Sequence, residues 1–266
     1  MKLRRLATVA AAAALFLGIS VSTAAADPAA QSQVYVALGD SYSSGVGAGS
    51  YDSGSGSCKR SNNAYPRLWA NANNPAAFHF TACSGAKTND VINNQLGPLN
   101  SSTTLVSISI GGNDAGFADA MITCVLQGTS SCVNRVNQAN AYIANQLPAR
   151  LDAVYSQIRA KAPNARVVVL GYPRMYKLNG SCWVGISETS RAAINGAADN
   201  IHAVTSQRAA AHGFVYGDVR GTFAGHEICG NLTEWIHSVA WPLDNSYHPK
   251  KAGQSGGYYP VLRSLA

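Results

Sequence analysis

The 266-residue sequence has few charged residues and no cluster of basic ones, and these absences exclude several classes of protein. Only 12% of the residues are charged and 47% are hydrophobic, which excludes an intrinsically disordered chain. The net charge of +7 is inflated by Lys2, Arg4 and Arg5, and no basic run is longer than two residues. The sequence therefore argues against a nucleic-acid-binding protein.

Motifs for metal and redox centres are missing as well. No Cys-x-x-Cys pair occurs, so the basic unit of zinc ribbons and thioredoxin-type sites is absent. Glu227 follows His226, but no second histidine stands four residues after His226, as a zinc protease motif requires. We therefore expect no metal site.

After residue 26 the sequence contains no apolar segment long enough for a membrane span. Residues 1–26 begin with basic residues, continue with a short Ala-rich apolar run and end in small residues at positions 24–26. This pattern predicts a secretory signal peptide over 1–26, with Ala30 as an alternative processing point, rather than a membrane anchor. We expect a secreted protein with a single domain over 31–266.

The number of cysteines agrees with export. An even number of cysteines in an exported chain argues for disulfides, although six cysteines allow 15 different pairings. Sequential pairing is the simplest of these, and it would join Cys58 to Cys83, Cys124 to Cys132, and Cys182 to Cys229.

Short apolar segments alternate with helical patterns along the chain. Apolar residues recur at helical spacing between Val136 and Ile158, with a break at Pro148, and again from Ile194 to Val204 before Gly213. This alternation predicts an α/β fold with a parallel central sheet covered on both faces, a three-layer α/β/α sandwich. The expected strands are residues 34–38, 105–110 and 167–170 and, with a weaker pattern, 214–219.

Two of these strands end in segments that suggest chemistry, residues 39–43 and 111–114. In open α/β sheets, ligands bind beyond the carboxyl ends of the strands. Ser41 would lie there at the start of a helix, with its hydroxyl in the crevice and its N–H facing a developing oxyanion. The alternative for an Asp-Ser pair at this point is a helix N-cap.

A second serine, Ser255, lies in a Gly-x-Ser-x-Gly sequence like the nucleophile elbow of α/β-hydrolases. That elbow needs a preceding strand and a later histidine, whereas Lys250 and Lys251 precede this segment and no histidine follows it. We expect a surface segment near the start of the last helix.

His248 is the strongest candidate for a general base, because Pro249 restricts the backbone directly after it. His202 falls on a helical pattern, where a structural role is expected. The other histidines have no supporting pattern, and they are His79, His212, His226 and His237.

Four blocks, at residues 39–45, 83–86, 111–114 and 246–249, occur in the order found in the SGNH-hydrolase (GDSL-type) family. The chain resembles that family, in particular its secreted lipases and phospholipases A1. The resemblance implies a flavodoxin-like SGNH-hydrolase fold, with Ser41 as nucleophile and His248 as general base. It also implies an oxyanion hole formed by the N–H groups of Ser41 and Gly85 and the side-chain amide of Asn113.

One position departs from the wider family, which usually has an aspartate three residues before the histidine. Here Asn245 stands at that position, and Asp244 stands one residue earlier. The chain is similar to the branch that uses a Ser–His dyad with a main-chain carbonyl orienting the ring. We therefore expect the carbonyl of Ser246, or alternatively of Asn245, to orient His248, with Asp244 secondary.

The resemblance implies hydrolysis of fatty-acyl esters of glycerolipids, through an acyl-enzyme and without a cofactor. Triacylglycerol lipase and phospholipase A1 activity both fit, and carbohydrate-ester deacetylase is a further alternative on the same fold. We expect a monomer that contacts lipid interfaces transiently. An exported binding module is the non-enzyme alternative, although no block residue needed for catalysis is missing.

Overall fold

The computed structural model describes residues 33–266, so the predicted signal peptide and its processing points lie outside the described residues. Within this range, five strands form one sheet in the order β2-β1-β3-β4-β5, and every neighbouring pair is parallel. This is the flavodoxin-like strand order. The strands are β1 (Val34–Gly39), β2 (Ala77–Phe80), β3 (Leu105–Ser109), β4 (Arg166–Leu170) and β5 (Val215–Gly217).

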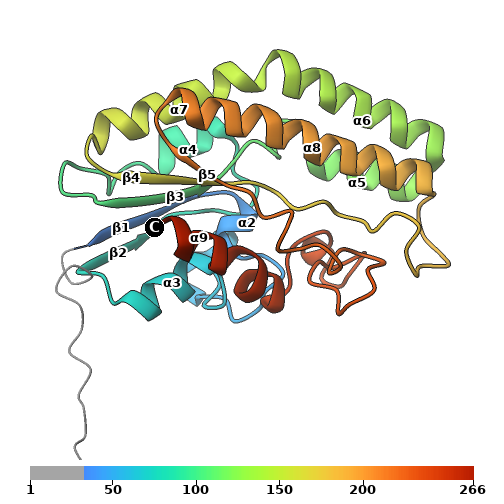
Figure 1. Ribbon diagram of the computed structural model, residues 1–266, viewed down its shortest axis with the longest axis horizontal. Coiled ribbons are helices and arrows are strands. Elements are labelled where there is room, and N and C mark those ends of the chain that lie inside the picture. The colour runs from blue at the N-terminus through green and yellow to red at the C-terminus, as the bar shows by residue number, and fades with distance from the viewer. Residues whose placement is uncertain (1–32) are drawn as a thin grey trace, which may run out of the picture.

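Helices cover both faces of the sheet, and the three-layer sandwich predicted from the sequence is confirmed (Figure 1). The layer above the sheet in Figure 1 contains α4 (Thr88–Asn94), α5 (Phe117–Leu126), α6 (Gly128–Asn145), α7 (Leu147–Lys161) and α8 (Glu188–Ala211). The layer below it contains α3 (Tyr65–Asn73) and α9 (Tyr259–Leu265), and the short α2 (Ser41–Ser44) follows β1. Among residues 33–266, no helix combines the length and hydropathy that a membrane span requires.

The four expected strands are present, but β2 was missed. Its four residues are mostly half-exposed, and it pairs only with β1 at the edge of the sheet, so it has no continuous apolar run. The predicted break at Pro148 is confirmed, because α6 ends at Asn145 and Pro148 lies in the first turn of α7.

All three disulfides join the cysteines in the predicted sequential pairs. Cys58–Cys83 joins the 3-10 helix η1 (Ser53–Cys58) to the loop after β2. Cys124–Cys132 joins α5 to α6, and Cys182–Cys229 joins the connection after β4 to the loop after β5. The bridges therefore restrain segments that follow the carboxyl ends of strands.

Candidate active site

Ser41 is the first residue of α2, directly beyond the carboxyl end of β1. Gly39 ends the strand with φ +121°, where a side chain would also clash with the Ser109 carbonyl oxygen. Asp40 caps the helix by accepting a hydrogen bond from the Tyr42 N–H at 3.0 Å. Because Ser41 opens the helix, its own N–H has no partner inside the helix and can face a ligand.

The structure brings Ser41 and His248 together, although 207 residues separate them in the sequence. His248 Nε2 lies 2.8 Å from Ser41 Oγ, and His248 Nδ1 lies 3.0 Å from the carbonyl oxygen of Ser246. A carbonyl only accepts hydrogen bonds, so Nδ1 carries the proton and Nε2 accepts from the serine hydroxyl. This is the protonation state in which a histidine can take the serine proton.

Burial of the imidazole lowers the pKa of His248 to about 4, and the hydrogen bond to the Ser246 carbonyl opposes this shift only in part. The ring is therefore neutral at pH 7, as a general base must be.

The structure also separates the three candidates for orienting His248. The Ser246 carbonyl bonds to the ring, whereas the Asn245 carbonyl accepts from the backbone N–H of His248 at 3.2 Å. The side chain of Asn245 accepts from the Tyr51 hydroxyl, and Asp244 forms an ion pair with Lys59.

Asn113 lines the same cavity as Ser41, and its Nδ2 donates to the Ala86 carbonyl at 3.1 Å. An amide nitrogen carries two hydrogens, so the second remains for a ligand. Gly85 is exposed, with φ +77°, on the loop between β2 and α4, and it lines a second hollow rather than the cavity of Ser41. The Asn113–Ala86 bond thus links the Gly85 loop to the Asn113 loop.

Two residues near the dyad were missed by the sequence analysis. The Tyr42 hydroxyl donates to the Tyr247 carbonyl at 2.6 Å, and Tyr247 has φ +62°, a conformation that is rare outside glycine. Buried Gln95 bonds both the N–H and the carbonyl of Gly39, at 2.7 and 2.9 Å. Tyr42 could have been suspected from its place beside Ser41, but Gln95 belongs to none of the four blocks.

An apolar cavity extends from Ser41 between α5, α6 and α8. Small and medium apolar side chains line most of it, so it can hold a hydrocarbon chain but offers few polar partners. Its apolar lining includes Phe117, Ala120, Met121, Val136, Ala139, Ile143, Met175, Ile194, Ala197, Ala198 and Ile201.

Ser255 lies apart from this arrangement, exposed in the π-helical segment η3 (Gly253–Tyr258) that precedes α9. No strand leads into it, so the structural context of a nucleophile elbow is missing. Over residues 33–266, no group of three or more His, Cys, Asp or Glu residues is arranged to hold a metal ion.

Residues 37–255 match the model of the GDSL-like Lipase/Acylhydrolase family. The chain is 61% identical over 267 aligned positions to a protein named Lipase from Streptomyces rimosus, covering 99% of each chain. It is similar to the crystal structure of an extracellular lipase from S. rimosus, with a TM-score of 0.86, 65% identity, and coverage of 88% of this chain and 100% of that one. It is equally similar to phospholipase A1 from Streptomyces albidoflavus, with a TM-score of 0.86, 66% identity, and coverage of 88% and 99%.

Proposed function

Because the chain belongs to the GDSL-like lipase/acylhydrolase family, we propose that it is a secreted serine hydrolase of fatty-acyl esters of glycerolipids. The observation that carries this proposal is the Ser41–His248 pair beside an apolar cavity, with Ser41 Oγ 2.8 Å from His248 Nε2. The proposal includes a signal peptide at residues 1–26 and one catalytic domain over 31–266. Three disulfides support export, because such bonds persist in oxidising environments.

In the first half of the reaction, Ser41 Oγ attacks the ester carbonyl carbon while His248 Nε2 takes the hydroxyl proton. The tetrahedral intermediate then collapses, the bond to the alcohol oxygen breaks, and His248 returns the proton to that alcohol. In the second half, water attacks the acyl-enzyme while His248 takes its proton, and His248 then returns that proton to Ser41 Oγ as the bond to the fatty acid breaks. The Ser246 carbonyl holds the ring in the required tautomer throughout.

The intermediate carries negative charge on the former carbonyl oxygen. We assign its stabilisation to the N–H of Ser41, the Nδ2 of Asn113 and the N–H of Gly85, which are neutral donors that need no desolvation of a charge. Asn113 is supported by its place in the lining of the Ser41 cavity. Loss of one such donor typically lowers kcat by about 10²–10³-fold.

The apolar cavity is the proposed acyl-chain site, and this favours long acyl chains over acetyl groups. Ala198 on α8 lines the cavity, whereas Ala203 on the same helix is exposed. Ala198→Phe should lower turnover of p-nitrophenyl palmitate much more than of p-nitrophenyl butyrate. The matched change Ala203→Phe should leave the ratio of the two rates unchanged, and equal loss on both esters in Ala198→Phe would contradict the acyl site.

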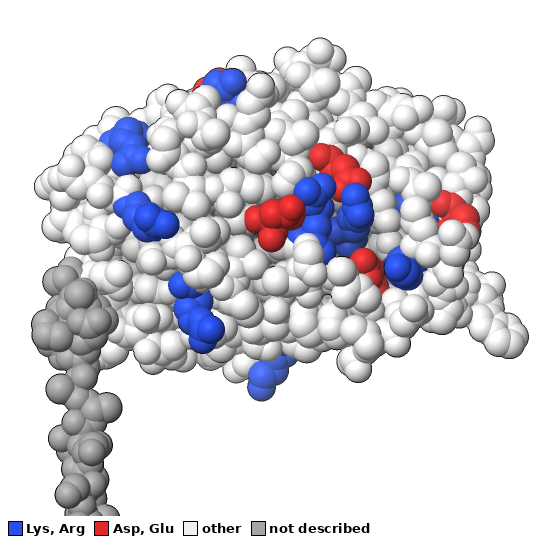
Figure 2. All heavy atoms as spheres, in the orientation of Figure 1, with Lys and Arg blue, Asp and Glu red and all other residues white. Residues whose placement is uncertain are grey.

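Contact with lipid interfaces is supported by apolar side chains that the fold leaves in solvent. Trp183, on the connection between β4 and α8 that projects at the right of Figure 1, is 99% exposed. Trp241, seven residues before His248, is 86% exposed. The projecting tip at the lower right of Figure 2 shows no charged side chain, while charges of both signs gather over the middle of that face. Tryptophan suits a lipid–water interface because its large ring carries one polar N–H group.

The decisive test compares two serines. Ser41→Ala should lower kcat on p-nitrophenyl butyrate by roughly 10⁴-fold or more, and Ser255→Ala should match the unmodified protein. A Ser41→Ala variant that retains turnover would overturn the proposal.

Phospholipase A1 is the second candidate for the main activity, favoured by the 66% identity to the S. albidoflavus enzyme. Hydrolysis of phosphatidylcholine and of triolein, with analysis of the products, separates the two. Release of the sn-1 fatty acid and of 2-acyl lysophosphatidylcholine, faster than hydrolysis of triolein, would identify a phospholipase A1.

A further inference from the structure

A buried polar network joins the ends of three strands beneath the proposed active site. Asp40, which follows β1, is 1% exposed, and its carboxylate accepts three hydrogen bonds. The donors are the Tyr42 N–H at 3.0 Å, the hydroxyl of Ser109 at the end of β3 at 2.9 Å, and the hydroxyl of Tyr172 just beyond β4.

Tyr172 connects this carboxylate to the loop that carries Asn113. Its hydroxyl oxygen accepts from the Gly112 N–H at 3.2 Å, and its single proton points to Asp40. The ring also packs against Gly112, where an added Cβ would lie 3.3 Å from it. Any shift of Tyr172 is therefore passed to the residue next to Asn113.

The side chains of the Asn113 loop form hydrogen bonds to a different part of the molecule, the segment around Ala86 and Thr88. Asn113 bonds to Ala86, and Asp114 accepts from the N–H and hydroxyl of Thr88 at 3.0 and 2.6 Å. These contacts fix the loop to the segment after β2, on the side of Gly85. The path through Tyr172 instead leads to Asp40, the residue that caps the helix of Ser41.

We propose that Asp40 and Tyr172 are positioning residues that hold the Gly112–Asn113 loop in register with Ser41. This inference rests on the proposed function, because it takes the roles of Ser41 and Asn113 from it. The oxyanion donors come from segments far apart in the chain, and a small displacement between them lowers the rate strongly, by about 10²-fold for 1 Å. Without the Tyr172 hydroxyl, the Gly112 N–H and one carboxylate oxygen of Asp40 lose their shared partner.

The test removes one hydroxyl group at each of two neighbouring tyrosines. Tyr172→Phe breaks the path, whereas Tyr258→Phe removes another buried hydroxyl, which donates to the Gly171 carbonyl at 2.9 Å. With p-nitrophenyl butyrate, Tyr172→Phe should lower kcat by roughly ten- to a hundredfold with KM little changed. Tyr258→Phe should stay within about twofold of the unmodified protein.

A double-mutant cycle with Asn113→Ala separates positioning from general destabilisation. If Tyr172 acts through the Asn113 loop, Tyr172→Phe should cost much less once the Asn113 amide is gone. Equal costs with and without Asn113, or equal kcat values in the two Phe variants, would overturn the proposal. If Tyr172→Phe does not fold, Ser109→Ala takes its place, with a several-fold loss of kcat expected and no loss as the contrary result.

Failure of the proposed function gives a different pattern. In that case Ser41→Ala and Asn113→Ala would both retain turnover, whatever the result for Tyr172→Phe.

Discussion

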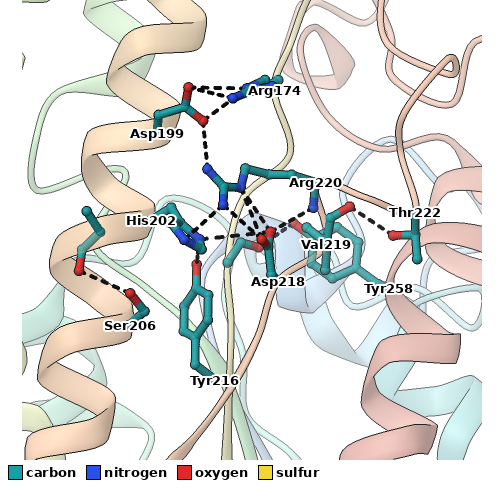
Figure 3. Close-up of polar contacts among 12 residues, drawn as sticks. Arg174, Asp199, His202, Ser206, Tyr216, Asp218, Val219, Arg220, Thr222 and Tyr258 are labelled. Carbon is teal, nitrogen blue, oxygen red and sulfur yellow. Dashed lines mark hydrogen bonds and ion pairs between the residues drawn. The ribbon is translucent and has the colours of Figure 1, made fainter.

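Asp40 and Asp218 occupy equivalent places at two different strands, since each directly follows the last residue of its strand. Around Asp40 the donors are tyrosine and serine hydroxyls and a backbone N–H, all without charge. Around Asp218 the main donor is the Arg220 guanidinium, which also bonds Asp199 at 2.8 Å and His202 at 2.9 Å (Figure 3).

The two sets of hydrogen-bond donors leave the two carboxyl groups with pKa values shifted in opposite directions. Burial raises the pKa of Asp40 to about 6, and the hydrogen bonds from Tyr172, Tyr42 and Ser109 offset this only in part. Partial burial acts in the same direction on Asp218, but hydrogen bonds from Arg220 outweigh it and lower its pKa. Asp218 is therefore charged at neutral pH, whereas Asp40 takes up a proton as the pH falls through about 6.

This difference shows that a position at the carboxyl end of a strand does not by itself give a carboxylate a role in the site. The Asp218 network joins the loop after β5 to α8 through permanent charges near the surface. The Asp40 network is buried beneath the proposed dyad, and the carboxylate that accepts its hydrogen bonds loses its charge when Asp40 takes up a proton near pH 6. Five measurements test or refine this contrast.

The largest effect is expected from removing the charge at each site. Asp40→Asn should lower kcat/KM by roughly 100-fold, because an amide has one acceptor oxygen and its NH₂ group would face the N–H and O–H donors. Asp218→Asn should remain within about twofold. Steady-state kinetics on p-nitrophenyl butyrate check this. Equal losses of kcat/KM in the two variants would show that the two carboxylates do not differ in their effect on the reaction.

The pH profile of activity should then show which group limits the reaction in acid. His248, with a pKa of about 4, stays neutral while Asp40 takes up its proton near pH 6, so kcat/KM should fall as the pH drops through about 6. The amide introduced by Asp40→Asn cannot titrate, so the weaker activity of this variant should decline only near pH 4. A limb near pH 6 that persists in Asp40→Asn would assign it to another group.

Thermal unfolding measured over the same pH range distinguishes a loss of activity from a loss of stability. The pKa of Asp40 is raised in the folded state, so its contribution to stability grows as the pH falls from about 6. The pKa of His248 is lowered from 6.5, so its contribution is lost as the pH falls toward 4. The two oppose each other between these values, and the loss of activity near pH 6 should precede any large fall in Tm.

A smaller effect is expected at the charged network. Arg220→Gln removes the shared cation between Asp199 and Asp218 and should lower the free energy of unfolding by about 1 kcal/mol. The loss should shrink at high salt, and kcat should stay within about twofold. Urea unfolding at low and high ionic strength measures it, and a large loss of kcat would show that this network also serves the site.

The smallest effect is expected for Asp244→Asn. Asp244 pairs with Lys59 at the surface and the Ser246 carbonyl holds the His248 ring, so kcat should change by less than about twofold. His248→Ala is the comparison, and a loss in Asp244→Asn that approaches it would mean that Asp244 supports the imidazole after all.

Much of the fold could be predicted because it depends on local patterns. The strand cores and the break at Pro148 follow from apolar periodicity and proline, which act over a few residues. The edge strand β2 could not be predicted, because its pairing with β1 rather than its own sequence makes it a strand. The candidate site residues Ser41, Asn113 and His248, in contrast, could be named from the sequence, because each lies in a short sequence block and the blocks occur in the order found in the family.

The sequence alone specified most of the strands and helices, and it offered the candidate side chains for ester hydrolysis. The three-dimensional arrangement was needed to show that the His248 ring bonds to the Ser246 carbonyl and not to Asn245 or Asp244. It also joined Tyr172 to Asp40, 132 residues apart. Periodicity and capping depend on neighbours in the chain, whereas hydrogen bonds between strand ends depend on how separate segments meet in space.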